Sequence, residues 1–194
     1  MNELALQEKI KTLISNFKPL TAEEIDLIAA KTIVKEYKKG DILLREGQIP
    51  TKCYMVVEGC VREYFLKDGE EKSTAFFTES DTFTPQLPNG EPSKYSWECV
   101  EDCILTVSTN NFAEELLTLI PRLEEVFRQI AINKINTAKA DWSEFISSSP
   151  EERYLNLQNK RPDIFNRVPQ HQIASYLGMT PQSLSRIRKR ISKV

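Results

Sequence analysis

The sequence predicts an α+β protein with two N-terminal helices, an antiparallel all-β unit, one long helix and a small helical C-terminal domain. Three observations predict this order. Apolar residues recur at helical spacing in residues 3–17 and 21–31. Short β-branched and aromatic runs fill residues 32–107, and helical spacing returns after Ser108. At 194 residues the chain is long enough to bury a core without disulfides or metals.

Local signals indicate where several elements begin and turn. Thr21 followed by Glu24 forms a capping box, so we expect the second helix to start there. In the all-β unit, one hairpin is expected to turn at Gly59 and the next at Gly69. A proline-rich stretch, residues 85–92, is expected to interrupt the last strands as a loop.

A long helix is predicted from Pro121, which suits the first position of a helix, to about Ile146. At 1.5 Å per residue it would be about 39 Å long. Because a helix of this length seldom buries its apolar stripe within a small chain, we expect it to pair with a second copy as a homodimer. The alternative is a helix that lies along its own β-unit. Residues 147–150 then break the helix and are expected to form a hinge.

Composition excludes several classes of protein. No apolar stretch reaches the roughly 18 residues that cross a bilayer, so no membrane segment is expected. Four dispersed cysteines favour a reduced, cytoplasmic protein. His171 is the only histidine and no CxxC pair is present, so neither a metal nor a cofactor is expected. No nucleophile–histidine–acid set and no glycine-rich phosphate loop can be assembled, so the chain is not expected to be an enzyme.

Charge is distributed unevenly along the chain. Residues 150–194 hold nine basic and three acidic residues, whereas the first 149 residues carry a net charge of −8. A basic C-terminal segment on an acidic body suggests contact with a polyanion. A solvated basic helix is the alternative.

Residues 170–188 have the pattern of a helix-turn-helix. Ala174 is small where two helices would cross, and Gly178 permits the left-handed turn between them. Thr180 can cap the second helix, and Pro181 suits its first turn. Four apolar residues would fill the wedge between the helices: Ile173, Leu177, Leu184 and Ile187.

The second of these helices is amphipathic. A rotation of 100° per residue separates Leu184 and Ile187 from a polar, basic face. On that face glutamine and arginine can read base edges, whereas lysine and further arginines can neutralise phosphates. The residues expected to contact DNA are Gln170, Thr180, Gln182, Ser183, Arg186, Lys189, Arg190 and Lys193.

The chain resembles the Crp/Fnr family of bacterial transcription regulators, in which a cyclic-nucleotide-binding β-roll, a long dimer helix and a C-terminal helix-turn-helix occur in this order. Residues 39–43, 45–47 and 54–59 are similar to the family's strand–turn repeats. The run from Ile173 to Arg188 is the more specific match, and it is similar to the subgroup found in Bacteroidetes.

The resemblance implies a β-roll of the double-stranded jelly-roll type within an effector domain over residues 1–120. It also implies a dimerisation helix over 121–147 and a DNA-binding domain over 148–194. The implied partners are double-stranded DNA, a second copy of the chain and RNA polymerase. Carried over from the family, the positions that enter the groove are those of Gln182, Ser183 and Arg186.

Two departures from the family pattern bear on function. Members that bind cyclic AMP carry Gly-Glu-Leu, followed about ten residues on by Arg-Ser/Thr-Ala. Residues 81–97 hold neither the Gly-Glu-Leu run nor the arginine, and Lys94 stands near the arginine position. We also expect the terminal wing hairpin typical of the family to be truncated, because Val194 follows closely on the recognition helix.

The effector pocket is therefore expected to differ from a standard cyclic-nucleotide site and to take a small anionic or neutral ligand, or none. Its expected residues are Phe83, Gln86, Lys94, Tyr95, Ser96 and Trp97. The first cysteine is Cys53 and the histidine lies outside the β-roll, so neither an iron–sulfur cluster nor haem is expected. Cys99 and Cys103 are either a thiol sensor or, as we favour, two small buried residues.

Together these features predict a homodimeric, sequence-specific DNA-binding transcription regulator of the Crp/Fnr type that responds to an unidentified effector. The alternative is a nucleotide-sensing or protein-interaction module that does not bind DNA.

Overall fold

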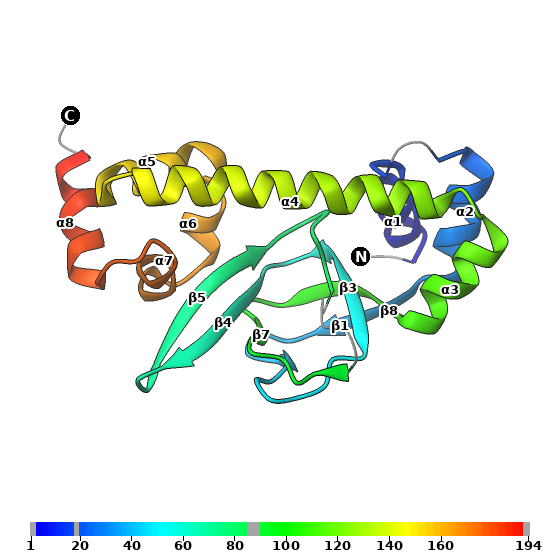
Figure 1. The fold of residues 1–194 in the computed structure, drawn as a ribbon, viewed down its shortest axis with the longest axis horizontal. Helices are drawn as coiled ribbons and strands as arrows, with labels where there is room; N and C mark the ends of the chain where they lie inside the picture. The colour runs from blue at the N-terminus through cyan, green and yellow to red at the C-terminus, as the bar shows by residue number, and fades with distance from the viewer. Residues whose placement is uncertain (1–2, 18–19, 85–89, 192–194) are drawn as a thin grey trace.

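The structure is a computed structural model, described here for residues 3–17, 20–84 and 90–191. One long helix runs along the molecule, with the N-terminal helices at one end and the C-terminal helices at the other (Figure 1). Both sheets lie on one side of this long helix (Figure 1). The elements run in the order α1 Glu3–Ser15, α2 Ala22–Lys31, β1 Ile33–Tyr37, β2 Ile42–Leu44, β3 Lys52–Glu58, β4 Val61–Lys67, β5 Glu70–Phe77, β6 Thr82–Phe83, β7 Ser96–Cys99, β8 Cys103–Thr109, α3 Asn110–Leu119, α4 Leu123–Ser147, α5 Pro150–Lys160, α6 Ile164–Arg167, α7 Gln170–Tyr176 and α8 Pro181–Ile191.

The strands form two four-stranded sheets with the orders β1-β8-β3-β6 and β2-β7-β4-β5. Neighbouring strands are antiparallel throughout, and side chains from both sheets meet in one buried cluster. This confirms the predicted α+β fold with an antiparallel roll. The sheets begin and end close to the predicted limits, since β1 starts at Ile33 and β8 continues two residues past Val107, to Thr109.

The two predicted hairpins have different outcomes. The turn at Gly69 is confirmed, because β4 and β5 pair directly and both Asp68 and Gly69 have positive φ, as a type I′ turn requires. The hairpin at Gly59 is wrong, because β3 and β4 belong to different sheets. At Gly59 the chain passes so close to β8 that a Cβ would lie 2.6 Å from the Sγ of Cys103. The glycine is therefore needed for a crossing between sheets.

The N-terminal helices pack on the outer face of the first sheet. Ile10, Leu13 and Ile14 of α1 are buried with Met55 and Val57 of β3. The predicted capping box of α2 is confirmed by reciprocal hydrogen bonds between Thr21 and Glu24.

The long helix α4 begins at Leu123, two residues after the predicted start. Pro121 instead lies in a turn that links α3 to α4, where the Leu123 N–H donates to the Ile120 carbonyl at 3.0 Å. The helix ends at Ser147, and Ser149 caps α5 through a second capping box with Glu152. Only residues 148 and 149 separate the two helices at the predicted hinge.

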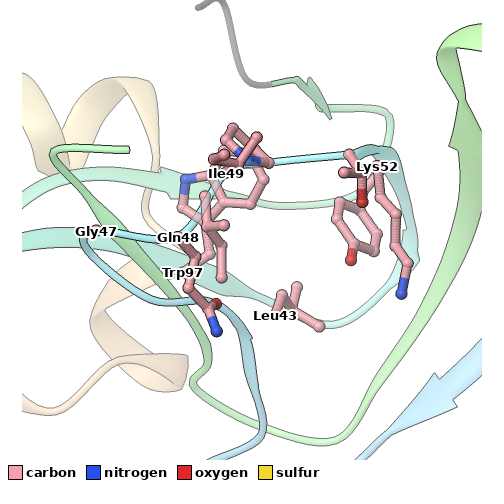
Figure 2. A pocket seen from close by; sticks show the side chains of 10 residues that line it. Leu43, Gly47, Gln48, Ile49, Lys52 and Trp97 are labelled. Atoms are coloured by element: carbon pink, nitrogen blue, oxygen red, sulfur yellow. The ribbon is translucent and has the colours of Figure 1, made fainter. Parts of the chain in front are cut away.

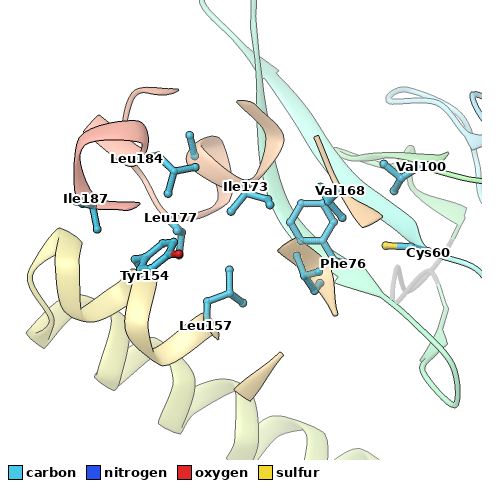
Figure 3. Close-up of a cluster of buried hydrophobic side chains, with 12 residues drawn as sticks. Cys60, Phe76, Val100, Tyr154, Leu157, Val168, Ile173, Leu177, Leu184 and Ile187 are labelled. Carbon is cyan, nitrogen blue, oxygen red and sulfur yellow. The ribbon is translucent and has the colours of Figure 1, made fainter. Parts of the chain in front are cut away.

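A separate core holds the C-terminal helices together and extends to the second sheet (Figure 3). Tyr154 and Leu157 of α5 are buried with Ile173 of α7 and Leu184 of α8. The cluster continues to Phe76 of β5, so the helical domain and the sheet share apolar surface.

Candidate DNA-binding surface and ligand-binding domain

The helices α7 and α8 are joined by a turn at Gly178. This glycine has φ +68°, and a Cβ there would lie 3.3 Å from the Nη1 of Arg153 and 3.4 Å from the Cζ of Phe145. The Ser183 N–H donates to the Thr180 hydroxyl at 3.2 Å, which confirms the predicted start of α8. Ala174 is fully buried at the predicted helix crossing. The predicted wedge of Ile173, Leu177, Leu184 and Ile187 is buried in one cluster.

The predicted DNA-contacting residues lie on the outside of this helix pair. Gln170, Thr180, Gln182, Arg186, Lys189 and Arg190 are exposed, and Ser183 is half-buried with its hydroxyl 3.0 Å from that of Thr180. Arg190 forms an ion pair with Glu151 of α5, so part of its charge is satisfied within the domain. Lys193 lies outside the described residues.

Most of the other basic residues of this region are engaged within the chain. Lys160 pairs with Asp141 and Glu144 of α4. The Arg153 guanidinium lies 3.9 Å from the centroid of the Phe145 ring, and its Nε donates to the Phe145 carbonyl at 3.0 Å. The net positive charge counted from the sequence is therefore larger than the unpaired positive charge that this domain exposes to a polyanion. The outward basic face is concentrated on α8.

A polar contact that the sequence does not reveal joins the C-terminal helices to the β-roll. The guanidinium of Arg167, at the end of α6, bonds both Glu79 carboxylate oxygens at 2.9 Å and Glu101 at 2.8 Å. The Arg161 Nη1 donates to the Phe76 carbonyl at 2.9 Å. No local pattern could have revealed this contact, because its partners are more than sixty residues apart in sequence.

The first helix of the pair, α7, lies directly on strand β5. The Ser175 hydroxyl accepts a hydrogen bond from the Ser73 N–H and donates one to the Glu71 carbonyl, both at 3.0 Å. The Tyr176 ring packs edge-on against Phe76, with centroids 5.3 Å apart. These contacts involve Ser175 and Tyr176 of α7, whereas Gln182 and Arg186 of α8 are exposed.

The predicted effector residues are divided between the core and the surface. Phe83 and Trp97 are each 4% exposed, and their rings meet edge-on with centroids 5.0 Å apart. Phe83 forms an aromatic stack with Tyr54 and Phe77. Ser96 is buried, and its hydroxyl accepts a hydrogen bond from the Glu46 N–H. The stack fills the space between the two sheets where Phe83 and Trp97 lie.

The other predicted effector residues lie away from this stack. Lys94 and Tyr95 are exposed, and Gln86 lies outside the described residues. Within the described chain, the predicted set does not converge on one cavity.

A hollow of about 530 Å³ opens beside the loop that connects β2 to β3 (Figure 2). Gly47, Gln48, Ile49 and Lys52 line it together with Trp97, which is the one residue of the predicted set found there. Its volume is within the range of small-molecule sites. The Trp97 indole N–H donates to the Glu63 carboxylate at 3.0 Å, which fixes the ring.

Three of the cysteines, Cys60, Cys99 and Cys103, are buried, and all four are free thiols. Burial raises the pKa of Cys60 to about 12, so this thiol is protonated at neutral pH. Cys99 and Cys103 end β7 and begin β8, in different sheets. Their burial favours the structural interpretation over a thiol sensor.

Comparison with known proteins agrees with this architecture. Residues 34–118, from β1 to α3, match the cyclic nucleotide-binding domain family. The segment that forms the β-roll is thus similar to a cyclic nucleotide-binding domain. It is 28% identical to the nitrogen fixation regulation protein FixK of Rhizobium meliloti (strain 1021), over 80% of this chain and 73% of FixK. It is 23% identical to the transcriptional activator protein FnrA of Stutzerimonas stutzeri, over 90% of this chain and 78% of FnrA.

The solved structure of FixK2 from Bradyrhizobium japonicum has the same fold, with a TM-score of 0.68, 19% identity and coverage of 84% of this chain and 85% of FixK2. The two relatives matched by sequence are thus a regulation protein and a transcriptional activator. Among the described residues, no three His, Cys, Asp or Glu side chains group as metal ligands, and no helix is long and apolar enough to cross a membrane.

Proposed function

We propose that this protein is a homodimeric, sequence-specific DNA-binding transcription regulator of the Crp/Fnr type, acting in the cytoplasm and in contact with RNA polymerase. The observation that carries the proposal is the outward face of α8, where Gln182 and Arg186 are exposed above a buried wedge. A capped start at Thr180 and a left-handed turn at Gly178 aim this helix away from the rest of the molecule. This is the arrangement that a recognition helix needs to enter a major groove.

Dimerisation is supported by the uncovered apolar face of α4. Phe127, Ile135, Trp142 and Ile146 are exposed, with Ile135 at 67% and Trp142 at 64%. At 100° per residue these four positions fall within about 100° of one another, so they form a single stripe. Leu123 and Val126 face the chain's own core instead. We propose that the stripe packs against the same stripe of a second copy.

The proposal is tested by the retardation of DNA in gels at several salt concentrations. Fragments recovered by immunoprecipitation of the protein from its own cells supply the specific sites. Specific affinity should fall steeply with salt, because Lys189 and its basic neighbours displace counterions from phosphates. The control variant Arg45→Ala should bind as the wild type does, because Arg45 is an exposed arginine of the β2–β3 loop and lies on neither α4 nor α8.

The alternative of a sensing or interaction module without DNA binding predicts no retardation on any recovered fragment. Loss of retardation in Arg186→Ala, with retention in Arg45→Ala, supports the proposal. Equal behaviour of these two variants contradicts it.

A further inference from the structure

A cavity of about 350 Å³ lies between the outer face of the first sheet and the helices α1 to α4. It shares Tyr54 with the hollow beside the β2–β3 loop, and Tyr54 and Phe83 with the aromatic stack inside the roll, but its other lining residues differ from theirs. The helices contribute apolar walls, among them Phe112 of α3 and Val126, Phe127 and Ile130 of α4. We call this space the helix–sheet cavity. Apolar walls of this kind hold the hydrophobic part of a ligand.

The sheet side of the helix–sheet cavity is different in chemistry. The residues that line this side include Thr82, Thr84, Thr106 and Cys53, whose side chains carry hydroxyl or thiol groups. The Cys53 thiol and the Thr84 hydroxyl lie 2.9 Å apart, so these two groups hydrogen-bond to one another. The cavity thus has one apolar wall and one wall with hydrogen-bonding groups.

A cation lies beside the polar wall of the cavity. Along α4, Val126, Ile130 and Lys134 follow one another at intervals of four residues and therefore share a face. The Lys134 ammonium donates to the Thr82 carbonyl at 2.5 Å and to the Thr82 hydroxyl at 2.6 Å. Two of its three N–H donors are used in this way.

The charge of Lys134 has no carboxylate partner within 4.0 Å in the described part of the chain. The nearby Asp81 carboxylate accepts the Thr78 N–H at 2.8 Å and faces Arg161 at 3.9 Å. Desolvation by its surroundings lowers the pKa of Lys134, and the charge of Asp81 opposes this effect only in part. An anion that reached this ammonium would be bound beside the Thr82 and Thr84 hydroxyls.

We infer that the helix–sheet cavity binds a small amphipathic carboxylate, with its tail among the α3 and α4 side chains and its head group at Lys134. At roughly 30 Å³ per water-sized group, the cavity has room for about a dozen non-hydrogen atoms. A ten-carbon fatty acid has this size. A cyclic nucleotide does not suit the site, because its sugar and base would face apolar side chains and its phosphate would meet a lysine without a guanidinium fork.

This site would deepen the proposed function by giving the regulator an effector class, and its regulatory meaning rests on that proposal. The cavity is walled on one side by α4, which leads directly to the C-terminal helices. Occupancy can therefore change the position of α4 relative to the sheet. Binding itself, however, is independent of whether the protein recognises DNA.

Calorimetric titration of the full-length protein with decanoate tests the site, with decan-1-ol as the uncharged probe of the same tail. The wild type should bind one decanoate per chain. Lys134→Ala should weaken decanoate by about tenfold or more, the loss of one charge-assisted hydrogen bond, and leave decanol unchanged. Lys139→Ala is the matched control, because Lys139 is an exposed lysine five residues further along the same helix. It should leave both ligands unaffected.

A second variant tests the cavity rather than the charge. Ala113, on α3, lines the cavity, and Ala113→Phe should fill it and abolish binding of both probes at an unchanged melting temperature. If this variant does not fold, Lys134→Ala against Lys139→Ala decides alone. Wild-type protein that binds no decanoate, as expected if side chains of a second copy occupy the cavity, overturns the inference. So does decanoate binding that is equal in Lys134→Ala and Lys139→Ala.

Gel retardation on the recovered DNA fragments separates this inference from the proposed function. Protein that binds decanoate with the expected variant effects but retards no DNA contradicts the proposed function and supports the site. Protein that retards DNA but binds no decanoate contradicts the site alone.

Discussion

The contact between Arg167 and the β-roll should determine how firmly the C-terminal helices are docked. Its guanidinium makes hydrogen bonds to Glu79 and Glu101 at 2.8 to 2.9 Å, and its side chain is 21% exposed. Fully exposed ion pairs contribute about 0.2–1 kcal/mol, and breaking a fully buried one costs about 3–5 kcal/mol. Because this contact lies between these limits, we expect Arg167→Met to lower the free energy of unfolding by about 2 kcal/mol.

Thermal unfolding followed by circular dichroism measures this effect. For a chain of this size, about 2 kcal/mol corresponds to a fall in Tm of about 4–8 °C. Arg128→Met is the control, because the ion pair of Arg128 with Glu125 is exposed on both sides and lies within one helix turn. It should change Tm by about 1 °C or less.

The same contact predicts a dependence on pH. Burial raises the pKa of Glu79, but hydrogen bonds from Arg167 and from the Gly59 N–H outweigh burial, so the net pKa lies below its ordinary value. A carboxyl with a lowered pKa adds stability above its unfolded pKa of about 4.3, and this stability is lost as pH falls through the lower folded value. The difference in Tm between wild type and Arg167→Met should therefore shrink below about pH 4. An Arg167→Met protein that melts like Arg128→Met, or a difference that stays constant down to pH 3, refutes this account.

Other substitutions test the remaining parts of the molecule. Gly178→Ala should destabilise the protein by about 1–2 kcal/mol, seen as a lower Tm, because it forces an alanine to adopt φ +68° against Arg153. Arg186→Ala should cost roughly 1–3 kcal/mol on specific DNA and relax the preference at one base pair, whereas Lys189→Ala should weaken specific and random DNA alike; equal losses in both assays contradict these roles. Ile135→Glu should convert the dimer to a monomer in sedimentation at micromolar concentration, and a wild type that is already monomeric disproves the proposed interface. Calorimetry with cyclic AMP should show no tight binding, and a low-micromolar Kd that Lys94→Ala abolishes would contradict our interpretation of residues 81–97.

Elements specified by local chemistry could be predicted from sequence. The capping box at Thr21, the type I′ turn at Gly69 and the start of α8 at Thr180 each depend on a few adjacent residues. The same holds for the wedge of the last two helices, because its spacing follows directly from the helical repeat. The amphipathic face of α8 could be predicted for the same reason.

Features that depend on contacts between distant segments could not be predicted. Gly59 resembles a hairpin glycine in sequence, and only the approach of β8 shows that it serves a crossing between sheets. Arg161 and Arg167 count as positive charge in the sequence, yet the structure places both against the β-roll. Similarly, Phe83 and Trp97 have the residue types of a ligand platform, but Phe83 stacks on Tyr54 and Trp97 meets Tyr54 edge-on, and these contacts assign both to the core.

In the proposed dimer, the continuous helix α4 would affect the spacing of the two proposed DNA-binding domains. Its 25 residues span about 37 Å at 1.5 Å per residue. A tilt of about 5° at the end near α1 would displace the far end by about 3 Å, close to the roughly 3.4 Å rise of one base pair. In a dimer, such a lever would move the two recognition helices out of register with half-sites about 34 Å apart. Helix α7 is also held to β5 by hydrogen bonds and ring packing, so a tilt of α4 would have to strain or break these contacts first. The strength of the α7–β5 contacts would therefore determine how large a force at the α1 end of α4 is needed to shift the recognition helices.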